Sequence, residues 1–588
     1  MNRRDALVAS LLAAGLMALL FPLSRLGVDA HHDGIMLKPA LDVLAGQVLF
    51  RDTFTQYGAL TTYLQAAALW IQPGLLSLRF MTVAAYGVSM FFLYAAWRLF
   101  LPRSLTIVAC GLFFLFIPSY ENNWLDQPWM LLPWSSVYAL MFQALSLYAL
   151  LNVIRHEQAG RWGVMLGLAA ACVFWCRQPV GMVTIGSIVV VWPALHWTGW
   201  APPGRSQRTI AFAIIGGFFG VHVLILAGIW LSGAGPEWWY QNFVWPRKFA
   251  LLAANAHWHA FYKMFVHPAA VLWLLALLLA AMLPGSLQRL GLRLPPRLVV
   301  AYYAGLGLLL AWQHARVDQA LALRTGGWTG LLPLVVVLQA AGSIWLGFTP
   351  RRAEKPAEYY LVAAAAALSL SSLVQYYPVP DTWHIMWALA PAFGLILFAF
   401  WRWSGWPAPV LAVVLAVAFL PSIVRRIQSA QVFLAQPYVT LTQPAVLRGM
   451  KVPPAQARSY GEITSVLDRI LKERPDIPTA LIGNDALFLS FTGNHINPLP
   501  YYVTWAALTD EADRLKRWSY ILEVRPLMFF HKANWSAVND FYRGSRYVPI
   551  AYITDEALEI AVPQELADAM GVTTYGAPKK TDAPNPPR

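Results

Sequence analysis

Polar and ionisable side chains gather in one short part of the chain, between residues 28 and 58. The segment VDAHHDG (28–34) holds two aspartates and two adjacent histidines, and FRDTFTQYG (50–58) adds an arginine and a Gln-Tyr-Gly turn. Asp29 and Asp33 are four residues apart, so on a helical turn they share one face. Carboxylates and imidazoles are groups that transfer protons or bind metal ions. This segment is therefore the best candidate for chemistry.

The His31-His32-Asp33 run allows two interpretations. One histidine together with Asp29 or Asp33 could supply ligands to a divalent metal, although adjacent histidines project in different directions and rarely bind one metal together. The alternative is a hydrated loop in which these side chains cap backbone groups, with Asp33-Gly34 as a turn pair. No metal ligand is assigned, and the residues alone leave both interpretations open.

The composition indicates a membrane protein. The chain has 588 residues, of which 58% are hydrophobic and only 12% are charged, whereas soluble proteins have about 25% charged residues. The formal net charge is +14, but the basic residues fall mainly in short loops, where they act as topology signals and meet anionic lipids. Nucleic-acid binding is therefore not expected. The three cysteines lie in apolar runs and are predicted to be packing residues.

Thirteen apolar runs are long enough to cross about 30 Å of hydrocarbon, which predicts a polytopic α-helical membrane protein. Strict alternation places the basic loops and the N-terminus in the cytoplasm. Residues 425–588 then lie outside, and the first run is expected to remain as an uncleaved helix. The runs lie at roughly 6–25, 77–100, 103–118, 133–153, 162–176, 179–199, 209–232, 266–284, 298–313, 328–348, 359–375, 386–403 and 407–424.

The outward side of this topology is rich in polar and aromatic residues. Loop 26–76 contains two amphipathic pieces, one around Leu37–Leu44 and one around Tyr63–Trp70, that are predicted to lie in the interface plane. Loop 233–265 is rich in aromatic residues, as is usual at head-group level. Ionisable and amide side chains also occur at helix ends on this side, namely Arg177, Gln178, Arg247, Lys248, Asp381 and His384.

Beyond residue 424 the composition becomes that of a soluble domain. Residues 478–493 read as strand and turn, 510–518 as helix, 520–530 as strand, 534–543 as helix and 548–553 as strand. This alternation predicts a small extracytoplasmic α/β domain over 425–575. The tail, 576–588, is rich in proline and charge and is predicted to be disordered.

The first loop resembles that of the GT-C glycosyltransferases, which include protein O-mannosyltransferases and lipid A aminoarabinose transferases. The resemblance lies in DAHHDGIMLKPALDVLAGQVLFRDTFTQYGALTTYL (29–64), with an acidic residue after the first helix, an interfacial helix and a Tyr-Gly stretch. RQPVG (177–181) and DTWHIMWALAP (381–391) are also similar to family segments. Many members have a paired acid where this chain separates Asp29 from Asp33 by three residues.

The resemblance implies a GT-C-like domain over 1–424 in a bacterial inner membrane, with the C-terminal domain in the periplasm. It implies inverting transfer of a sugar from a polyprenyl-phosphate donor to a hydroxyl of a glycan, lipid or protein. Asp33 or Asp29 would act as general base, and a cation would stabilise the departing phosphate. The candidates for phosphate binding are Lys38, Arg51, Arg177, Arg247 and Lys248. The candidates for substrate binding are His32, Gln56, Tyr57, Gln178, Asp381 and His384.

Two other functions compete with glycosyl transfer. A transporter or flippase for lipid-linked glycans usually places charges mid-membrane on broken helices, whereas here the ionisable groups lie at the outer ends of helices. An O-antigen ligase or polymerase tends to use a large outer loop between late helices, whereas here the acidic loop follows the first helix.

Overall fold

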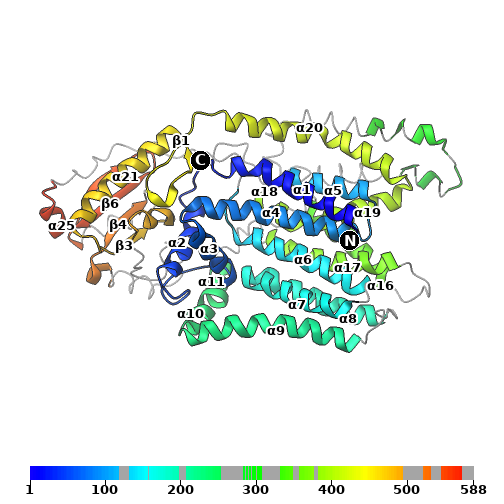
Figure 1. The fold of residues 1–588 in the computed structure, drawn as a ribbon, viewed down its shortest axis with the longest axis horizontal. Coiled ribbons are helices and arrows are strands. Elements are labelled where there is room, and N and C mark those ends of the chain that lie inside the picture. Colours follow the sequence, from blue (N-terminus) through cyan, green and yellow to red (C-terminus); the bar gives the residue numbers. More distant parts are fainter. Residues whose placement is uncertain are drawn as a thin grey trace.

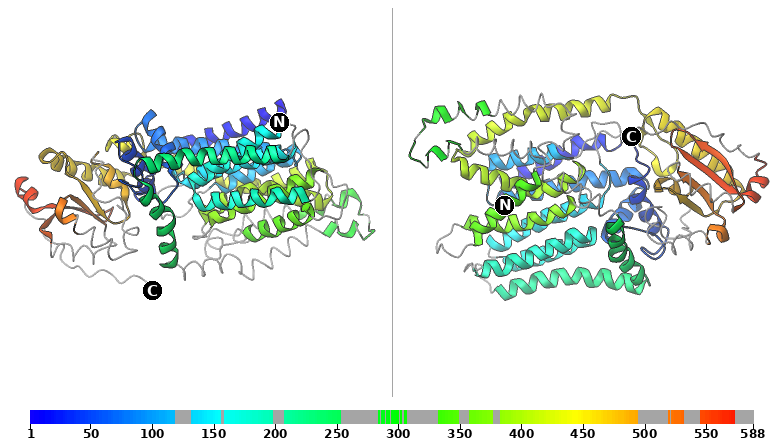
Figure 2. Two further views of the ribbon diagram at one scale, coloured as in Figure 1. Left: turned by 90° about the horizontal axis from the view of Figure 1, so that it is seen from below. Right: turned by 180° about the vertical axis from the view of Figure 1, so that it is seen from behind.

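The fold is described from a computed structural model. It covers residues 1–117, 131–155, 158–197, 207–252, 332–348, 357–376, 382–493, 521–531 and 545–572, with short pieces between 283 and 306 and at 519. Long helices form a bundle in which most run side by side, and a small sheet domain lies at one end of the bundle (Figure 1). Figure 2 shows the same two-part arrangement from two further sides.

Eight helices within these ranges are long and apolar enough to cross a membrane, which confirms a multi-pass membrane protein. They are α1 (Arg3–Leu23), α4 (Leu75–Trp97), α6 (Ser135–Arg155), α7 (Ala159–Cys176), α8 (Gln178–Trp197), α9 (Gln207–Leu231), the continuous stretch Met386–Ser404, and α20 (Ala408–Leu434).

The count of thirteen crossings is not confirmed. Three of the other expected runs form shorter helices, α5 (Arg103–Phe116), α16 (Leu332–Phe348) and α17 (Ala357–Ser372). The stretch 386–404 comprises the end of α18 (Thr382–Leu389), a 3-10 turn η4 (Ala390–Ala392) and α19 (Phe393–Ser404). The run 266–284 and most of 298–313 lie outside the described residues.

Two short helices of the first loop lie at the end of the bundle that faces the sheet domain, α2 (His32–Leu44) and α3 (Ala59–Ile71) (Figure 1). On α3, Tyr63 and Trp70 are exposed while Thr62 and Gln65 are buried. An exposed apolar face of this kind suits a helix lying among lipid head groups. Both amphipathic pieces predicted in the first loop are thus helical, as α2 and α3.

A second short helical segment follows α9 at the same end of the bundle. It consists of α10 (Gly235–Trp239), a π-helical turn η1 (Tyr240–Val244) and α11 (Trp245–Leu252). In the left view of Figure 2 the green α10–η1–α11 segment runs across the direction of the bundle helices.

The C-terminal domain contains a four-stranded sheet in the order β3-β4-β6-β5. β3 (Thr479–Ile482) and β4 (Leu527–His531) are parallel, whereas β6 (Leu558–Pro563) pairs antiparallel with both β4 and β5 (Tyr547–Ile553). The domain also has α21 (Pro454–Glu473), the 3-10 turns η5 (Ala445–Leu447) and η6 (Ala486–Ser490), α25 (Gln564–Ala569), and a ribbon of β1 (Val439–Thr440) and β2 (Lys451–Val452).

The sequence predictions for this domain are partly met. The strands near 479 and 548 are present, but the strand expected at 520–530 begins only at Leu527 and residues 521–524 are helical. Pro526 explains the late start, because proline has no N–H to donate and is tolerated at the beginning of a strand. Strand β6 was not predicted. The helices expected at 510–518 and 534–543 lie outside the described residues.

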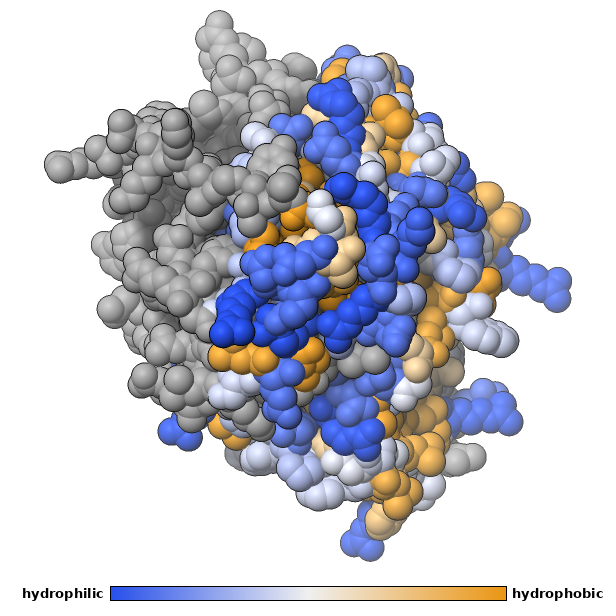
Figure 3. Space-filling view, turned by 90° about the vertical axis from the view of Figure 1, so that its left-hand side faces the viewer, coloured by the Kyte–Doolittle hydropathy of each residue, from blue (hydrophilic) through white to orange (hydrophobic). Residues whose placement is uncertain are grey.

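The sheet domain packs directly on the first loop. Lys451 N donates to Arg25 O at 2.7 Å, and Leu487 N donates to Ala30 O at 3.1 Å. Gly34 on α2 lies so close to η6 that a methyl group there would collide with the backbone of Leu487. Figure 3 faces the end of the molecule that carries this domain and shows hydrophilic side chains over much of the coloured surface.

Candidate active site

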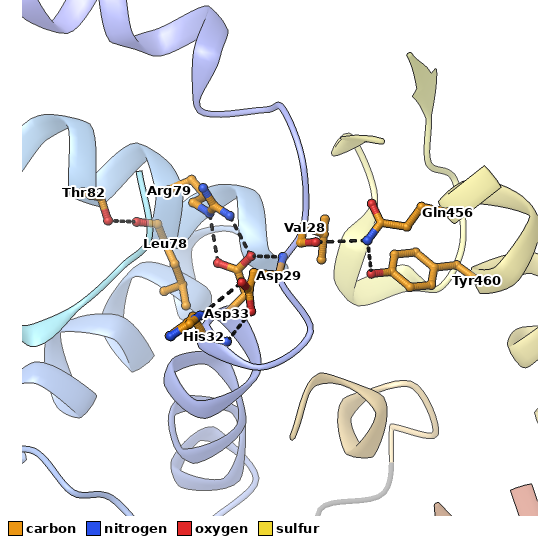
Figure 4. Close-up of polar contacts among 9 residues, drawn as sticks. All are labelled: Val28, Asp29, His32, Asp33, Leu78, Arg79, Thr82, Gln456 and Tyr460. Atoms are coloured by element: carbon orange, nitrogen blue, oxygen red, sulfur yellow. Dashed lines mark hydrogen bonds and ion pairs between the residues drawn. The ribbon is translucent and has the colours of Figure 1, made fainter. Parts of the chain in front are cut away.

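The two aspartates of the first loop have different surroundings. Asp33, on the first turn of α2, is fully buried and accepts two hydrogen bonds from Arg79 of α4, from Nε at 3.0 Å and from Nη2 at 2.6 Å. Its Oδ2 also accepts from Asp29 N at 2.9 Å (Figure 4). Burial raises the pKa of Asp33, and the charge of Arg79 opposes that rise. Asp33 therefore joins the loop to α4.

Asp29 faces His32 instead. Its Oδ1 accepts from His32 N at 2.6 Å, and its Oδ2 lies 3.1 Å from His32 Nδ1. Burial acts to raise the pKa of Asp29, but the hydrogen bonds and charge of His32 outweigh it, and the net pKa is lowered. The His32 side chain is 26% exposed. Asp29 and His32 thus form a carboxylate–imidazole pair (Figure 4), in which the carboxylate is buried and the imidazole is partly exposed.

Aromatic side chains extend from this pair. The ring of His32 packs edge-on against Trp134, with centroids 5.1 Å apart. Trp134 in turn stacks on His384 at 5.8 Å and contacts Trp387 at 5.1 Å. The structure therefore brings His384 close to the first loop, as the grouping of outward polar residues predicts. Asp381 lies outside the described residues.

Arg177 also contacts the start of α6. It follows the last residue of α7 in an extended conformation, and its Nη1 donates to Ser136 on the first turn of α6. Burial raises the pKa of the Tyr57 hydroxyl, while the positive charge of Arg177 and a hydrogen bond with Gln56 oppose the rise. Tyr57, one of the residues predicted to bind substrate, therefore lies within electrostatic range of Arg177, and Gln56 hydrogen-bonds with Tyr57.

Residues at the start of α6 therefore contact both parts of the candidate site. Trp134, which directly precedes α6, touches His32, and Ser136, two residues later, accepts from Arg177. The N-terminus of a helix carries unsatisfied N–H groups and a partial positive charge, both of which favour an anion. The imidazole of the Asp29–His32 pair and the Arg177 cation consequently both make contacts at a helix N-terminus.

The remaining cations have other surroundings. Lys38 and Asp42 are both fully buried and form an ion pair, and Asp42 also accepts from Thr53 Oγ1 at 2.7 Å. Arg51 is 49% exposed and pairs with Asp52 at 2.8 Å.

On α11, Arg247 is exposed, whereas Lys248 lies over the Tyr240 ring at 5.3 Å from its centroid. Gln178 is buried and donates to Asn242 in η1.

The C-terminal domain adds further polar groups beside the first loop. His31 Nδ1 lies 2.7 Å from Asn484 O, and Asp485 Oδ2 lies 3.3 Å from His531 Nε2. Burial lowers the pKa of His31 and raises that of Asp485. Only the position of the Asn484-Asp485 turn, directly after a buried strand, could have drawn attention to it. Arg79 was also missed, because it lies within an apolar run expected to span the membrane.

The structure offers limited support for a metal. Within the described ranges, no group of three His, Cys, Asp or Glu side chains is arranged to hold a metal ion. Asp29 and His32 supply two potential ligands.

No protein-family model and no curated protein matches the chain. Among solved structures it is similar to the oligosaccharyltransferase of Archaeoglobus fulgidus tethered to an acceptor peptide, at 11% identity over 96% of this chain and 74% of that chain, with a TM-score of 0.47. It is also similar to ArnT from Cupriavidus metallidurans bound to undecaprenyl phosphate, at 12% identity over 95% and 97% of the two chains, with a TM-score of 0.43. Both are GT-C superfamily members, the superfamily that the first loop resembles. At these scores the likeness assigns no substrate and no residue role.

Proposed function

We propose that this protein transfers a sugar from a polyprenyl-phosphate donor to an acceptor hydroxyl at the outer face of the membrane, with inversion. The observation that carries the proposal is that the start of α6 contacts both parts of the site: Trp134, the residue before α6, packs against His32 of the Asp29–His32 pair, and Ser136 in its first turn accepts from Arg177. Glycosyl transfer from a lipid phosphate needs a base on one side of the anomeric carbon and a cation on the other.

Asp29 is the better general base of the two aspartates. The Asp33 carboxylate already accepts three hydrogen bonds and neutralises a buried arginine. Removing that charge would take from the buried Arg79 the carboxylate with which it forms an ion pair, which is strongly unfavourable. The pKa of Asp29 is lowered by His32, which favours the ionised form, and the side chain of His32 is 26% exposed. We therefore assign proton acceptance to Asp29 and a structural role to Asp33.

The proposed step is a single displacement. The acceptor oxygen attacks the anomeric carbon while its proton passes to Asp29, and the bond from that carbon to the phosphate oxygen breaks. The electron pair of the broken bond remains on the polyprenyl phosphate. Arg177 would neutralise that charge, helped by the neutral Tyr57 hydroxyl as a hydrogen-bond donor. Lys248, on the segment beside the membrane, would meet the lipid phosphate as it arrives or leaves.

The arrangement of the chain supports the proposed orientation. The N-terminus lies at the end of the bundle opposite the first loop and the sheet domain (Figure 1). At that end Asp5 of α1 accepts from Arg98, directly after α4, at 3.1 Å and from Arg103, the first residue of α5, at 2.9 Å, which gathers two basic residues there. Basic residues are retained on the cytoplasmic side. We therefore propose a cytoplasmic N-terminus, a catalytic membrane domain over 1–424 and a periplasmic domain over 425–575 in a bacterial inner membrane.

Single variants test the function and the choice of base. Turnover of a polyprenyl-phosphate sugar would be measured in detergent for Asp29→Asn and Asp33→Asn, with Asp476→Asn, at an exposed site before β3, as the matched control. We expect Asp29→Asn to lower kcat at least about a hundredfold in protein that keeps the wild-type melting temperature. Wild-type turnover in a folded Asp29→Asn protein would exclude Asp29 as base. Transbilayer movement of the lipid without sugar transfer would instead support the flippase alternative.

A further inference from the structure

The π-helical turn η1 directs two neighbouring buried amides to the candidate site. A π-turn has i→i+5 hydrogen bonds and therefore more residues per turn than an α-helix. Consecutive side chains consequently point in more similar directions than the roughly 100° separation of an α-helix. In η1 the two buried consecutive residues are Gln241 and Asn242.

Gln241 holds the first loop by two backbone hydrogen bonds. Its Oε1 accepts from Thr55 N at 3.2 Å, and its Nε2 donates to Phe50 O at 2.7 Å. Phe50 has a φ of 72°, in the left-handed region that bulky residues rarely adopt. Such a conformation persists only where the surroundings hold it. The amide of Gln241 is therefore part of what keeps residues 50–55 in place.

Asn242 holds the loop that carries Arg177. Its Nδ2 donates to Trp238 O at 2.9 Å, which orients the amide, and its Oδ1 accepts from Gln178. Gln178 is the neighbour of Arg177 in sequence. Both Gln178 and Asn242 are buried. Loss of either amide would therefore remove a hydrogen-bond partner of the other that solvent does not readily replace.

The two loops held by η1 also contact each other. Gly58 N donates to Cys176 O at 3.1 Å, and Thr61 Oγ1 donates to the same carbonyl at 3.2 Å. A side chain at Gly58 would collide with the carbonyl of Trp175. Tyr57 and Arg177 thus lie on two segments whose relative position is set by their mutual contact and by η1.

We infer that Gln241 and Asn242 are positioning residues, and that η1 is a clamp that sets Tyr57 and Arg177 at the spacing needed to bind a polyprenyl phosphate. The choice of ligand rests on the proposed function, whereas the clamp rests on the contacts of η1 alone. Neither amide needs to touch the lipid.

Phosphate affinity tests the clamp. Full-length protein in nanodiscs would be titrated with undecaprenyl phosphate alone, comparing Gln241→Ala, Asn242→Ala and Arg177→Ala. The matched control is Gln339→Ala, since Gln339 donates within α16, to Ser343 at 2.7 Å. We expect each clamp variant to weaken binding about tenfold, and the control to bind as the wild type does.

Coupling distinguishes positioning from general destabilisation. The losses for Asn242→Ala and Gln178→Ala should not add fully in the double variant, because both substitutions remove the same hydrogen bond between Gln178 and Asn242. The same non-additivity is expected between Asn242→Ala and Arg177→Ala. Where Gln241→Ala lowers the yield of folded protein, Gln241→Glu keeps the size of the side chain and the acceptor for Thr55 N, and it replaces the donor to Phe50 O with a carboxylate oxygen.

Hydrogen exchange separates failure of the clamp from failure of the proposed function. Backbone amides of 50–58 and 175–181 should exchange faster in the Gln241 and Asn242 variants than in the wild type or the control. If exchange is unchanged in the Gln241 and Asn242 variants, the clamp is wrong. The clamp is also wrong if these variants exchange faster but bind undecaprenyl phosphate as the wild type does, while Arg177→Ala weakens binding. If Arg177→Ala does not weaken binding, the proposed phosphate site is wrong, and exchange alone decides whether η1 holds the two loops.

Discussion

The carboxylate of Asp33 and the guanidinium of Arg79 form a doubly hydrogen-bonded pair in which both side chains are fully buried. The pair connects the first turn of α2 to α4, one of the long helices of the bundle. It therefore fixes the first loop to the membrane domain close to Asp29.

Breaking this pair should destabilise the protein. Asp33→Asn leaves a buried guanidinium without its counter-ion, which we expect to cost about 3–5 kcal/mol. Thermal unfolding in nanodiscs would measure the loss. The double variant Asp33→Leu with Arg79→Met should recover much of the stability, because neither side chain is then charged. A folded, wild-type-like Asp33→Asn protein that has lost transfer would instead return Asp33 to the role of base.

The pH dependence of transfer should depend on His32. The folded-state pKa of Asp29 is lowered, so its carboxylate is ionised above that value and its contribution to stability is lost as pH falls through it. In His32→Ala, burial remains while the side-chain hydrogen bond is removed, and the pKa of Asp29 should rise. The acid limb of the kcat–pH profile should then move to higher pH. An acid limb at the same pH in both proteins would contradict the pairing.

Lys38 should act through Asp42 rather than on a substrate. Lys38→Met removes the ammonium group that neutralises the buried Asp42 carboxylate, so we expect loss of stability and of transfer. Replacing both residues, as Lys38→Met with Asp42→Leu, should restore stability and part of the activity. Restored melting temperature without any transfer would indicate that Lys38 binds the donor phosphate.

The contact between α2 and η6 should tolerate no side chain. A methyl group at Gly34 collides with the backbone of Ala486 and Leu487, so Gly34→Ala should separate the two segments and slow transfer. Limited proteolysis would report the separation as faster cleavage of the C-terminal domain. Gly15→Ala, which meets nothing within 4 Å on α1, is the control and should leave both measurements unchanged.

Much of the architecture could be predicted from local pattern. Apolar runs indicated the membrane helices, and the spacing of apolar residues predicted α2 and α3, because these features depend on neighbours in the sequence. The partners of Asp33 and His31 could not be predicted, since Arg79 is 46 residues away and Asn484 is 453 residues away. Such pairing depends on how the helices pack.

Other parts of the site carry no sequence signal of their own. The amides of η1 resemble ordinary polar residues of an aromatic loop, and the amino-acid sequence there does not distinguish a π-turn from an α-helix. The division of roles between Asp29 and Asp33 likewise required knowledge of their surroundings.

The backbone contact between Ala30 and Leu487 has a consequence for biosynthesis. The loop that holds Asp29 and His32 is synthesised near the beginning of the chain, but its partner in η6 is made more than 450 residues later. If the proposed topology holds, every membrane helix must be inserted and residue 487 exported before this hydrogen bond can form. A chain truncated or stalled before residue 487 would therefore carry Asp29 and His32 without this contact, which would delay activity until η6 has been made.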